Sequence, residues 1–314
     1  MPIKKIAVVI PLYNKAAHIA ETLESVLTQS SPPDEVIIVD DGSTDGSNEI
    51  VSRYTHLGIS LIRQKNQGES AARNTGINAS DSNYVAFLDA DDSWYPNHIK
   101  TLRELISRHP DAALLSSAHI IRRGGHMFKP SSAFPADWTG IVPDFFSAYC
   151  VGLSLVNSTT ACASRDALLD IGGFPVGIRR GPDVITWIRL ALKFPVAHTA
   201  TVTAVYNRDA INRTDRLMER TPPGSLVFMS ELLQDASLPL TTRKSIGLLF
   251  DRIAIFTAAG FCLNSDKTGL AAIRQLAKNT KRWQTTLFLL CLSLAPKNLL
   301  LLAQKYRHRR TVSH

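Results

Sequence analysis

Short apolar runs alternate with amphipathic stretches along the first 110 residues of the chain. The runs are rich in β-branched residues, which is typical of strands covered on both faces. Between them, apolar residues recur at helical spacing, as Ile19, Leu23 and Val26 do within residues 16–29. The alternation predicts an α/β fold with a doubly wound, mostly parallel sheet and right-handed crossovers. The expected strands are residues 6–10, 35–39, 59–63 and 84–88, and the expected helices are 16–29, 47–54 and 69–79.

The pattern is less regular after residue 110. Strands are expected at residues 112–122, around 154–163 and at 196–206, and the last two flank a helix at 183–193. Residues 124–152 are predicted to be mostly loop. Beyond residue 221 the pattern is helical to the end of the sequence. We therefore expect a domain of residues 1–220, made of halves 1–110 and 111–220, followed by a helical, basic extension at 221–314.

The positive charge of the chain is concentrated in its last 48 residues. The net charge is +8, but residues 267–314 hold ten Lys or Arg and no Asp or Glu. The other residues carry 25 basic and 27 acidic side chains. A basic groove for nucleic acid is therefore not indicated on the body of the protein.

Cysteine usage and the start of the chain bear on location. Four cysteines (Cys150, Cys162, Cys262 and Cys291) are far apart and form no CxxC pair. They are expected to be free thiols in a reducing compartment. The first apolar run is too short for a signal peptide. We expect a cytoplasmic protein.

Polar residues follow three of the expected strands, where ligands bind in open parallel sheets. Pro11, Tyr13 and Asn14 follow the first strand, Asp40 and Asp41 the second, and residues 89–92 (DADD) the fourth. The sequence has no GxGxxG or GxxxxGK[ST] motif that would bind phosphates. These features predict an acidic crevice at one end of the sheet.

Asp89 and Asp91 are two residues apart, so on an extended chain they point the same way. Two such carboxylates repel each other unless a cation lies between them, and oxygen ligands suit Mg²⁺ or Mn²⁺. The alternative is that these aspartates are turn residues and helix caps, since a DxD pattern is short. The same alternative holds for DDGSTDGS, where Thr44 or Ser47 is the expected cap of the next helix. Capping does not require adjacent Asp40 and Asp41, however, and one of them could bind a nucleoside base or ribose.

Four segments follow one another in the first 96 residues: IPLYNK (10–15), VDDGSTDGS (39–47), NQGESAARNTGI (66–77) and FLDADDSWYP (87–96). Taken together and in this order, they resemble the family-2 glycosyltransferases of the GT-A fold. The resemblance is strong over about the first 110 residues and looser to about residue 206. It implies a GT-A, Rossmann-like fold, a nucleotide-diphospho-sugar donor, a divalent cation (Mn²⁺ or Mg²⁺) and an inverting, single-displacement reaction.

The resemblance also implies roles for single residues. Pro11 and Tyr13 would line the pocket of the donor's base, and Asp41 would bind the uracil edge with Asp40 nearby. Arg73 would contact the base or the phosphates; taken alone, it could as well be a surface arginine on an amphipathic helix. Asp89 would lie near the ribose with Ala90 also on the donor side, Asp91 would ligate the metal, and Asp92 could support either.

An inverting transfer needs a base for the acceptor hydroxyl. In the family this base is an Asp that begins a helix, usually in a Gly-Glu-Asp sequence before an apolar helix with a Trp. The matching stretch is GPDVITW, which supplies Asp183 with Trp187 four residues on. Pro182 replaces the usual Glu, but proline is compatible with the first position of a helix. On the residues alone, Asp183 is equally an N-terminal helix residue favoured by the macrodipole.

Residues 287–303 are apolar but interrupted by Pro296, Lys297 and Asn298, so they fall short of a spanning helix. Lys/Arg-rich stretches flank them on both sides, which favours contact with an anionic membrane surface. The alternative is a helical pair packed on the catalytic body.

The sequence thus predicts a glycosyltransferase acting at the inner face of the cell membrane. It would transfer a sugar, most simply from a UDP-sugar, to a glycan or lipid-linked acceptor. Two alternatives are a non-catalytic sugar-nucleotide-binding protein and a sugar nucleotidyltransferase. The latter would usually carry a Gly-rich phosphate loop near its N-terminus, which PLYNK does not resemble.

Overall fold

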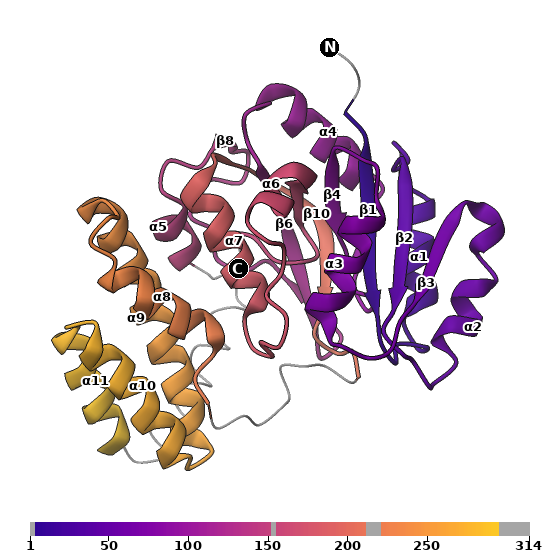
Figure 1. Ribbon diagram of the computed structural model, residues 1–314. Coiled ribbons are helices and arrows are strands. Elements are labelled where there is room, and N and C mark those ends of the chain that lie inside the picture. Colours follow the sequence, from indigo (N-terminus) through magenta and orange to yellow (C-terminus); the bar gives the residue numbers. More distant parts are fainter. Residues whose placement is uncertain (1–3, 152–154, 212–220, 295–314) are drawn as a thin grey trace.

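A single mixed sheet forms the centre of the molecule (Figure 1). The computed structural model describes residues 4–151, 155–211 and 221–294. In this part of the chain ten strands form the sheet, in the order β3-β2-β1-β4-β9-β6-β10-β5, with β7 beside β6 and β8 beside β10. The strands are β1 (Ile6–Leu12), β2 (Glu35–Asp40), β3 (Ile59–Arg63), β4 (Tyr84–Phe87), β5 (Ser93–Trp94), β6 (Leu114–Arg123), β7 (His126–Phe128), β8 (Thr139–Ile141), β9 (Ala161–Ser164) and β10 (Val196–Asn207).

The first half of the sheet is parallel, as the alternating pattern predicts. β1 lies between β2 and β4, and Val9 pairs with Ile37 on one side and Phe87 on the other. Every residue of β1 is buried, which explains the continuous apolar run. Because β1, β2 and β4 are parallel, the loops that follow them lie at the same end of the sheet, and the strand order reverses between β1 and β4.

The second half of the sheet departs from the mostly parallel expectation. β9 runs between β4 and β6 and is antiparallel to both, and β5 and β8 are antiparallel to β10. The stretch predicted to be loop also contains β7, β8 and a short helix, α5 (Phe145–Cys150). These elements are only two to six residues long, too short to show a hydrophobic period.

Helices cover both faces of the sheet. One face packs against α1 (Ile19–Leu27), α2 (Ser47–Ser52) and α4 (His98–Arg108). The other face packs against α3 (Glu69–Ala79), α5, α6 (Arg165–Asp170) and α7 (Pro182–Lys193). A short 3-10 helix, η1 (Thr55–Leu57), precedes β3. The result is a three-layer α/β architecture.

The helical extension packs beside α5 and α7 and is seen at the lower left of Figure 1. It comprises α8 (Gly224–Gln234), α9 (Leu240–Leu263), α10 (Lys267–Asn279) and α11 (Trp283–Leu294). Of the described helices, α9 alone is long and apolar enough to cross a membrane by length and composition. Ile246, Leu249 and Phe250 of α9 are fully buried in the same core as α7, however. The end of the predicted apolar stretch, from residue 295 on, lies outside the described residues.

Candidate active site

The loops after β1 and β2 are joined by hydrogen bonds around Asn14. Asn14 has a positive φ of 51°, which asparagine tolerates better than most residues. Its backbone N–H donates to Ser43 Oγ (3.0 Å), and its side-chain oxygen accepts from the N–H of Thr44 (2.8 Å). Beside this turn, Pro11 is buried in β1 and Tyr13 is 47% exposed. Contact of Pro11 and Tyr13 with the donor's base stays a prediction.

Asp40 and Asp41 organise the loops that follow β2. The Asp40 carboxylate accepts from the N–H of Ser43 (2.9 Å) and so closes the turn. The Asp41 carboxylate accepts from Gln64 Nε2 (2.7 Å) and from the N–H groups of Gln67 (2.9 Å) and Gly68 (2.7 Å). Both aspartates are buried, and Asp41 holds the loop before α3 against the end of β2. Contact of Asp41 with a uracil edge stays a prediction.

Arg73 joins α3 to the acidic loop after β4. Its side chain is 2% exposed, so the surface-arginine alternative is wrong. The Nη2 atom donates to Asp89 Oδ1 (2.7 Å) and to the Glu69 carboxylate one helical turn away. Glu69 was not singled out from the sequence, although its i,i+4 spacing to Arg73 is the available signal. Contact of Arg73 with the donor's base or phosphates stays a prediction.

The Gly-Gly-Phe turn at residues 172–174 packs against α3 beside Arg73. Asn74 on α3 accepts from the N–H of Phe174 and donates to its carbonyl, both at 2.8 Å. The Phe174 ring lies under the guanidinium, with Arg73 Cζ 5.2 Å from its centroid. The same ring packs edge-on against Phe87 and Trp187. An aromatic cluster from β4, the turn and α7 therefore holds Arg73 in place.

The three aspartates after β4 have three different surroundings. Asp89 pairs with Arg73, and the Asp91 carboxylate pairs with Lys15 Nζ at 2.7 Å. Asp92 is 2% exposed and accepts from the hydroxyl of Thr159 and the N–H of Asn207 (2.7 Å). Burial raises the pKa of Asp92 well above its usual range, and the negative charges of Asp89 and Asp91 raise it further. Asp92 thus anchors the loop to β10, and Ala90 is buried between Asp89 and Asp91.

Asp183 lies in the first turn of α7, close to this cluster. Pro182 is the first residue of the helix, as the sequence allows, and Gly181 precedes it with a positive φ of 74°. Burial raises the pKa of Asp183; the positive charge of Arg73 and a hydrogen bond from the N–H of Val184 offset part of the rise, and Asp89 adds to it. Asp183 in turn raises the pKa of the buried Tyr149 on α5, after burial as the main cause. The structure therefore brings Asp183, Arg73 and Asp89 together.

Comparison with known proteins assigns the family. Residues 7–170 match the family described as Glycosyl transferase family 2. This is more than half of the chain. The chain belongs to glycosyl transferase family 2.

Relatives and solved structures agree with this family-2 assignment. Glycosyltransferase GlyA of Streptococcus pneumoniae serotype 4 is 39% identical over 113 residues, which are 35% of this chain and 16% of that protein. For this and the other most similar curated relatives, the match spans less than half of the relative's own length. S. aureus TarS residues 1–349, solved in complex with UDP-GlcNAc, has a TM-score of 0.73 and 18% identity, covering 97% of this chain and 92% of that one. The mannosyltransferase PcManGT of Pyrobaculum calidifontis, in complex with GDP-Man and Mn²⁺, has a TM-score of 0.54 and 20% identity, covering 93% and 86%. The fold of this family-2 chain is that of the GT-A glycosyltransferases.

The site fits a divalent metal that is bound by Asp91 together with groups that do not come from the protein. Across the described ranges, no three His, Cys, Asp or Glu side chains cluster as a protein-only metal site requires. Asp91 offers carboxylate oxygens and its side chain is 10% exposed at the end of the sheet. Mg²⁺ is commonly bound through one or two carboxylates, with substrate phosphates and water as the other ligands. The residues therefore fit a metal that arrives with, or is completed by, a diphosphate.

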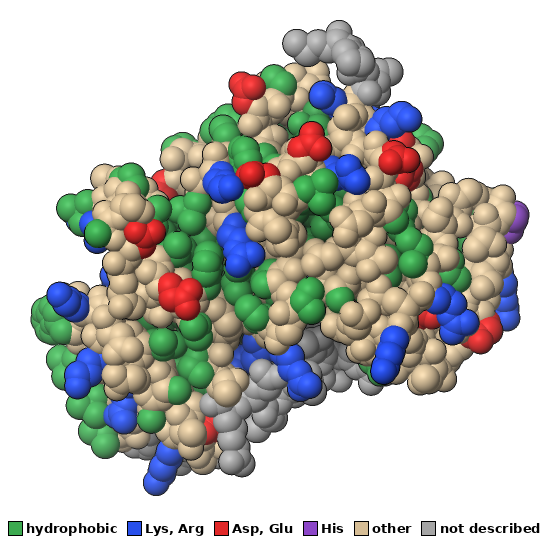
Figure 2. Space-filling model, viewed as in Figure 1, with side chains coloured by type: hydrophobic (Ala, Val, Ile, Leu, Met, Phe, Trp, Pro, Cys, Tyr) green, Lys and Arg blue, Asp and Glu red, His purple; other side chains and the backbone are tan. Residues whose placement is uncertain are grey.

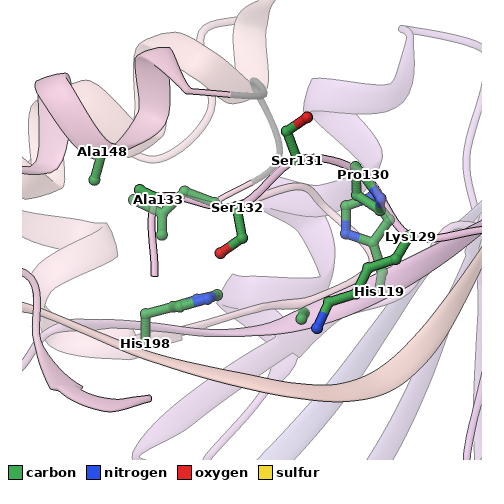
Figure 3. Close-up of a pocket in the computed structure, with 10 residues that line it drawn as sticks. His119, Lys129, Pro130, Ser131, Ser132, Ala133, Ala148 and His198 are labelled. Atoms are coloured by element: carbon green, nitrogen blue, oxygen red, sulfur yellow. The ribbon is translucent and has the colours of Figure 1, made fainter. Parts of the chain in front are cut away.

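The family-2 chain also has a small cavity between β6, β10 and the loop before β8 (Figure 3). Figure 3 shows His119 and Lys129 toward one end of it and His198 toward the other. Burial lowers the pKa of both histidines to about 4, and for His198 the charges of His119 and Lys129 add to the effect. The cavity volume is about 20 Å³, which is room for about one water molecule. Ala148 on α5 also lines it.

Proposed function

We propose that the chain transfers a sugar from a nucleotide-diphospho-sugar to a hydroxyl group of a glycan or lipid-linked acceptor, with inversion at the sugar. We propose a UDP-sugar as the donor, by analogy with TarS, which was solved with UDP-GlcNAc. One observation carries the proposal: the carboxylate at the start of α7 is electrostatically coupled to the Arg73–Asp89 pair on the donor side. A base beside the donor-binding loop is what a single displacement requires.

On the donor side, each residue has a defined task in this proposal. Pro11 and Tyr13 line the pocket of the base, and Asp41 accepts a hydrogen bond from the base while it fixes the loop before α3. Arg73 orients Asp89 toward the ribose, supported by Glu69 and by the Phe174 ring. Fixing these groups before the donor binds reduces the entropy lost on reaching the reactive geometry.

The metal proposed for the site is Mn²⁺ or Mg²⁺, with Asp91 as its protein ligand. When bound, it would offset the negative charge that develops on the departing diphosphate. PcManGT, solved with Mn²⁺, is a precedent in the same fold.

On the acceptor side, Asp183 takes the proton from the attacking hydroxyl. Its raised pKa matches this task, because a base works best when its pKa is close to the working pH. Tyr149 stays protonated because burial and the charge of Asp183 raise its pKa, so it can donate a hydrogen bond next to the base. A hydroxyl of the substrate bound between α5 and α7 would thus meet a hydrogen-bond acceptor, Asp183, and a hydrogen-bond donor, Tyr149.

The proposal is tested in two steps. Thermal-shift screening of UDP-sugars and GDP-sugars with Mn²⁺ should give stabilisation by one donor, and EDTA should remove it. Asp183→Asn should then retain donor binding and lose transfer by a factor of about a thousand or more. Donor binding without transfer in the wild-type protein, across a panel of acceptors, would favour a non-catalytic sugar-nucleotide-binding protein instead.

We also propose that the helical extension places the enzyme at the inner, cytoplasmic face of the cell membrane. Trp283, Leu287 and Leu294 on α11 are each more than half exposed. Lys267, Lys278 and Lys281 are exposed in the same part of the extension. Figure 2 shows hydrophobic and basic side chains intermixed there, at the lower left. Apolar groups bordered by lysines suit an anionic lipid surface, where each basic residue adds about 1 kcal/mol.

A further inference from the structure

The acidic loop after β4 is neutralised by side chains of the protein itself. From the sequence alone, a metal is expected beside Asp89 and Asp91, because no other positive charge is identified that would offset their repulsion. In the structure Arg73 supplies one positive charge to Asp89, and Lys15 supplies another to Asp91. The carboxylate proposed as the metal ligand therefore already has a cation.

Lys15 is held firmly enough to be a specific partner. It follows the left-handed turn at Asn14, and its backbone N–H donates to Ser47 Oγ at 2.8 Å. The prediction that Thr44 or Ser47 caps α2 is wrong, since the N-cap residue is Gly46, and Ser47 binds Lys15 instead. The ammonium group donates to Asp91 Oδ2 at 2.7 Å and to the carbonyl of Ile211 at 3.1 Å. The side chains of Lys15 and Asp91 are only 13% and 10% exposed.

We propose that Lys15 is the resident counter-ion of Asp91 and competes with the divalent metal for that carboxylate. The inference rests on the proposed function, since it takes Asp91 as the metal ligand. The ammonium group lies 2.7 Å from Oδ2 of Asp91, so a divalent ion bound to this carboxylate would meet a like charge a few ångströms away. Metal binding therefore favours movement of Lys15 away from Asp91, which its flexible four-carbon side chain allows. The apo-protein should bind metal weakly, and the lysine should leave Asp91 when a metal binds.

The test is a titration of the full chain with Mn²⁺ in the absence of any nucleotide. Electron paramagnetic resonance measures the concentration of free Mn²⁺, which gives the dissociation constant. Lys15→Met should bind Mn²⁺ about tenfold or more tightly than the wild type, since the ammonium repels a divalent ion a few ångströms away. Lys15→Arg, which keeps the charge, should resemble the wild type. Lys100→Met removes an equal charge from the exposed side of α4 and should also resemble the wild type.

A double variant tests whether the gain in Mn²⁺ affinity depends on the Asp91 carboxylate. Lys15→Met combined with Asp91→Asn should lose it, because the ligand is gone. Equal or weaker Mn²⁺ binding by Lys15→Met, or tight binding that survives Asp91→Asn, would overturn the inference. Circular dichroism of each variant establishes that it is folded. The measurement uses neither donor nor acceptor, so a failure of the proposed transfer reaction would be seen separately, in the absence of donor binding to the wild type.

Discussion

At the scale of single residues, the pH dependence of the reaction follows from Asp183. A base must be unprotonated, and burial raises the pKa of this carboxyl above its ordinary value. We expect kcat/KM to fall as the pH is lowered through that raised pKa, above the ordinary aspartate value of about 3.9. The measurement is the pH profile of kcat/KM with donor and metal saturating. An acid limb at or below the ordinary value would contradict the assignment.

Stability gives an independent check of the same shift. The folded-state pKa of Asp183 is raised above the unfolded value, so its stabilising contribution is complete below the unfolded pKa. It is lost as the pH rises through the folded pKa. Asparagine does not ionise, so Asp183→Asn should have a higher midpoint of thermal unfolding than the wild type at pH 7. The difference should vanish below about pH 4.

Asp92 contributes to stability through its hydrogen bonds. Asp92→Ala would leave the buried N–H of Asn207 and the hydroxyl of Thr159 without this acceptor. The expected loss is about 2–4 kcal/mol in the free energy of unfolding, because two buried groups lose a carboxylate acceptor. Asp92→Asn can still bond to both groups and should lose much less. Urea unfolding of the two variants compares them, and equal losses would show that the hydrogen bonds are not the cause.

At the scale of elements, the position of α3 depends on Gly76. A Cβ atom at this residue would lie 2.4 Å from Cγ1 of Val9 on β1, so Gly76→Ala forces helix and strand apart. We expect a loss of about 1–3 kcal/mol in the free energy of unfolding. Donor affinity should fall too, because α3 carries Arg73. The readouts are urea unfolding and the thermal shift with donor.

A matched control lies in α9. An added Cβ at Gly260 meets no atom within 4 Å, so Gly260→Ala should be neutral or stabilise by up to about 1 kcal/mol through helix propensity. Combining Gly76→Ala with Val9→Ala should restore part of the donor affinity by making room. If both glycine variants behaved alike, close packing would not explain the effect.

Elements with a clear hydrophobic period could be predicted from the sequence, and contacts between distant loops could not. β3 and α3 have the predicted bounds, because buried β-branched runs and helical spacing are local signals. The strand predicted around residues 154–163 is in fact the short β9 (Ala161–Ser164), and its antiparallel direction was not predicted, since four residues (ACAS) carry no period. The motifs indicated Asp89, Asp91 and Asp183 as site residues, and those roles stay predictions. Lys15 and Thr159, the partners of Asp91 and Asp92, were missed because these pairs depend on loops that meet only in the fold. Glu69 was missed although its i,i+4 spacing to Arg73 is a local signal.

At the scale of the whole molecule, the body and the extension share one core. Trp187 of α7 and Phe250 of α9 are buried in the same apolar cluster. The helical extension is therefore continuous with the acceptor half and the helix that carries Asp183. The domain boundary at residue 220 stays a prediction. If the extension binds a membrane, the acceptor half of the site has a fixed position relative to the lipid surface.

Membrane contact is tested with vesicles and the full chain. We expect co-sedimentation with vesicles of phosphatidylcholine and phosphatidylglycerol, and little with phosphatidylcholine alone, because the exposed lysines of the extension need anionic lipid. Replacing Trp283 by Ala and Leu287 and Leu294 by Ser should weaken binding about tenfold or more, since these side chains would be buried in the interface. Leu57→Ser and Val176→Ser remove exposed apolar side chains elsewhere and should leave binding unchanged. Equal binding to both kinds of vesicle, or none to either, would favour an extension that serves only to pack on the catalytic body.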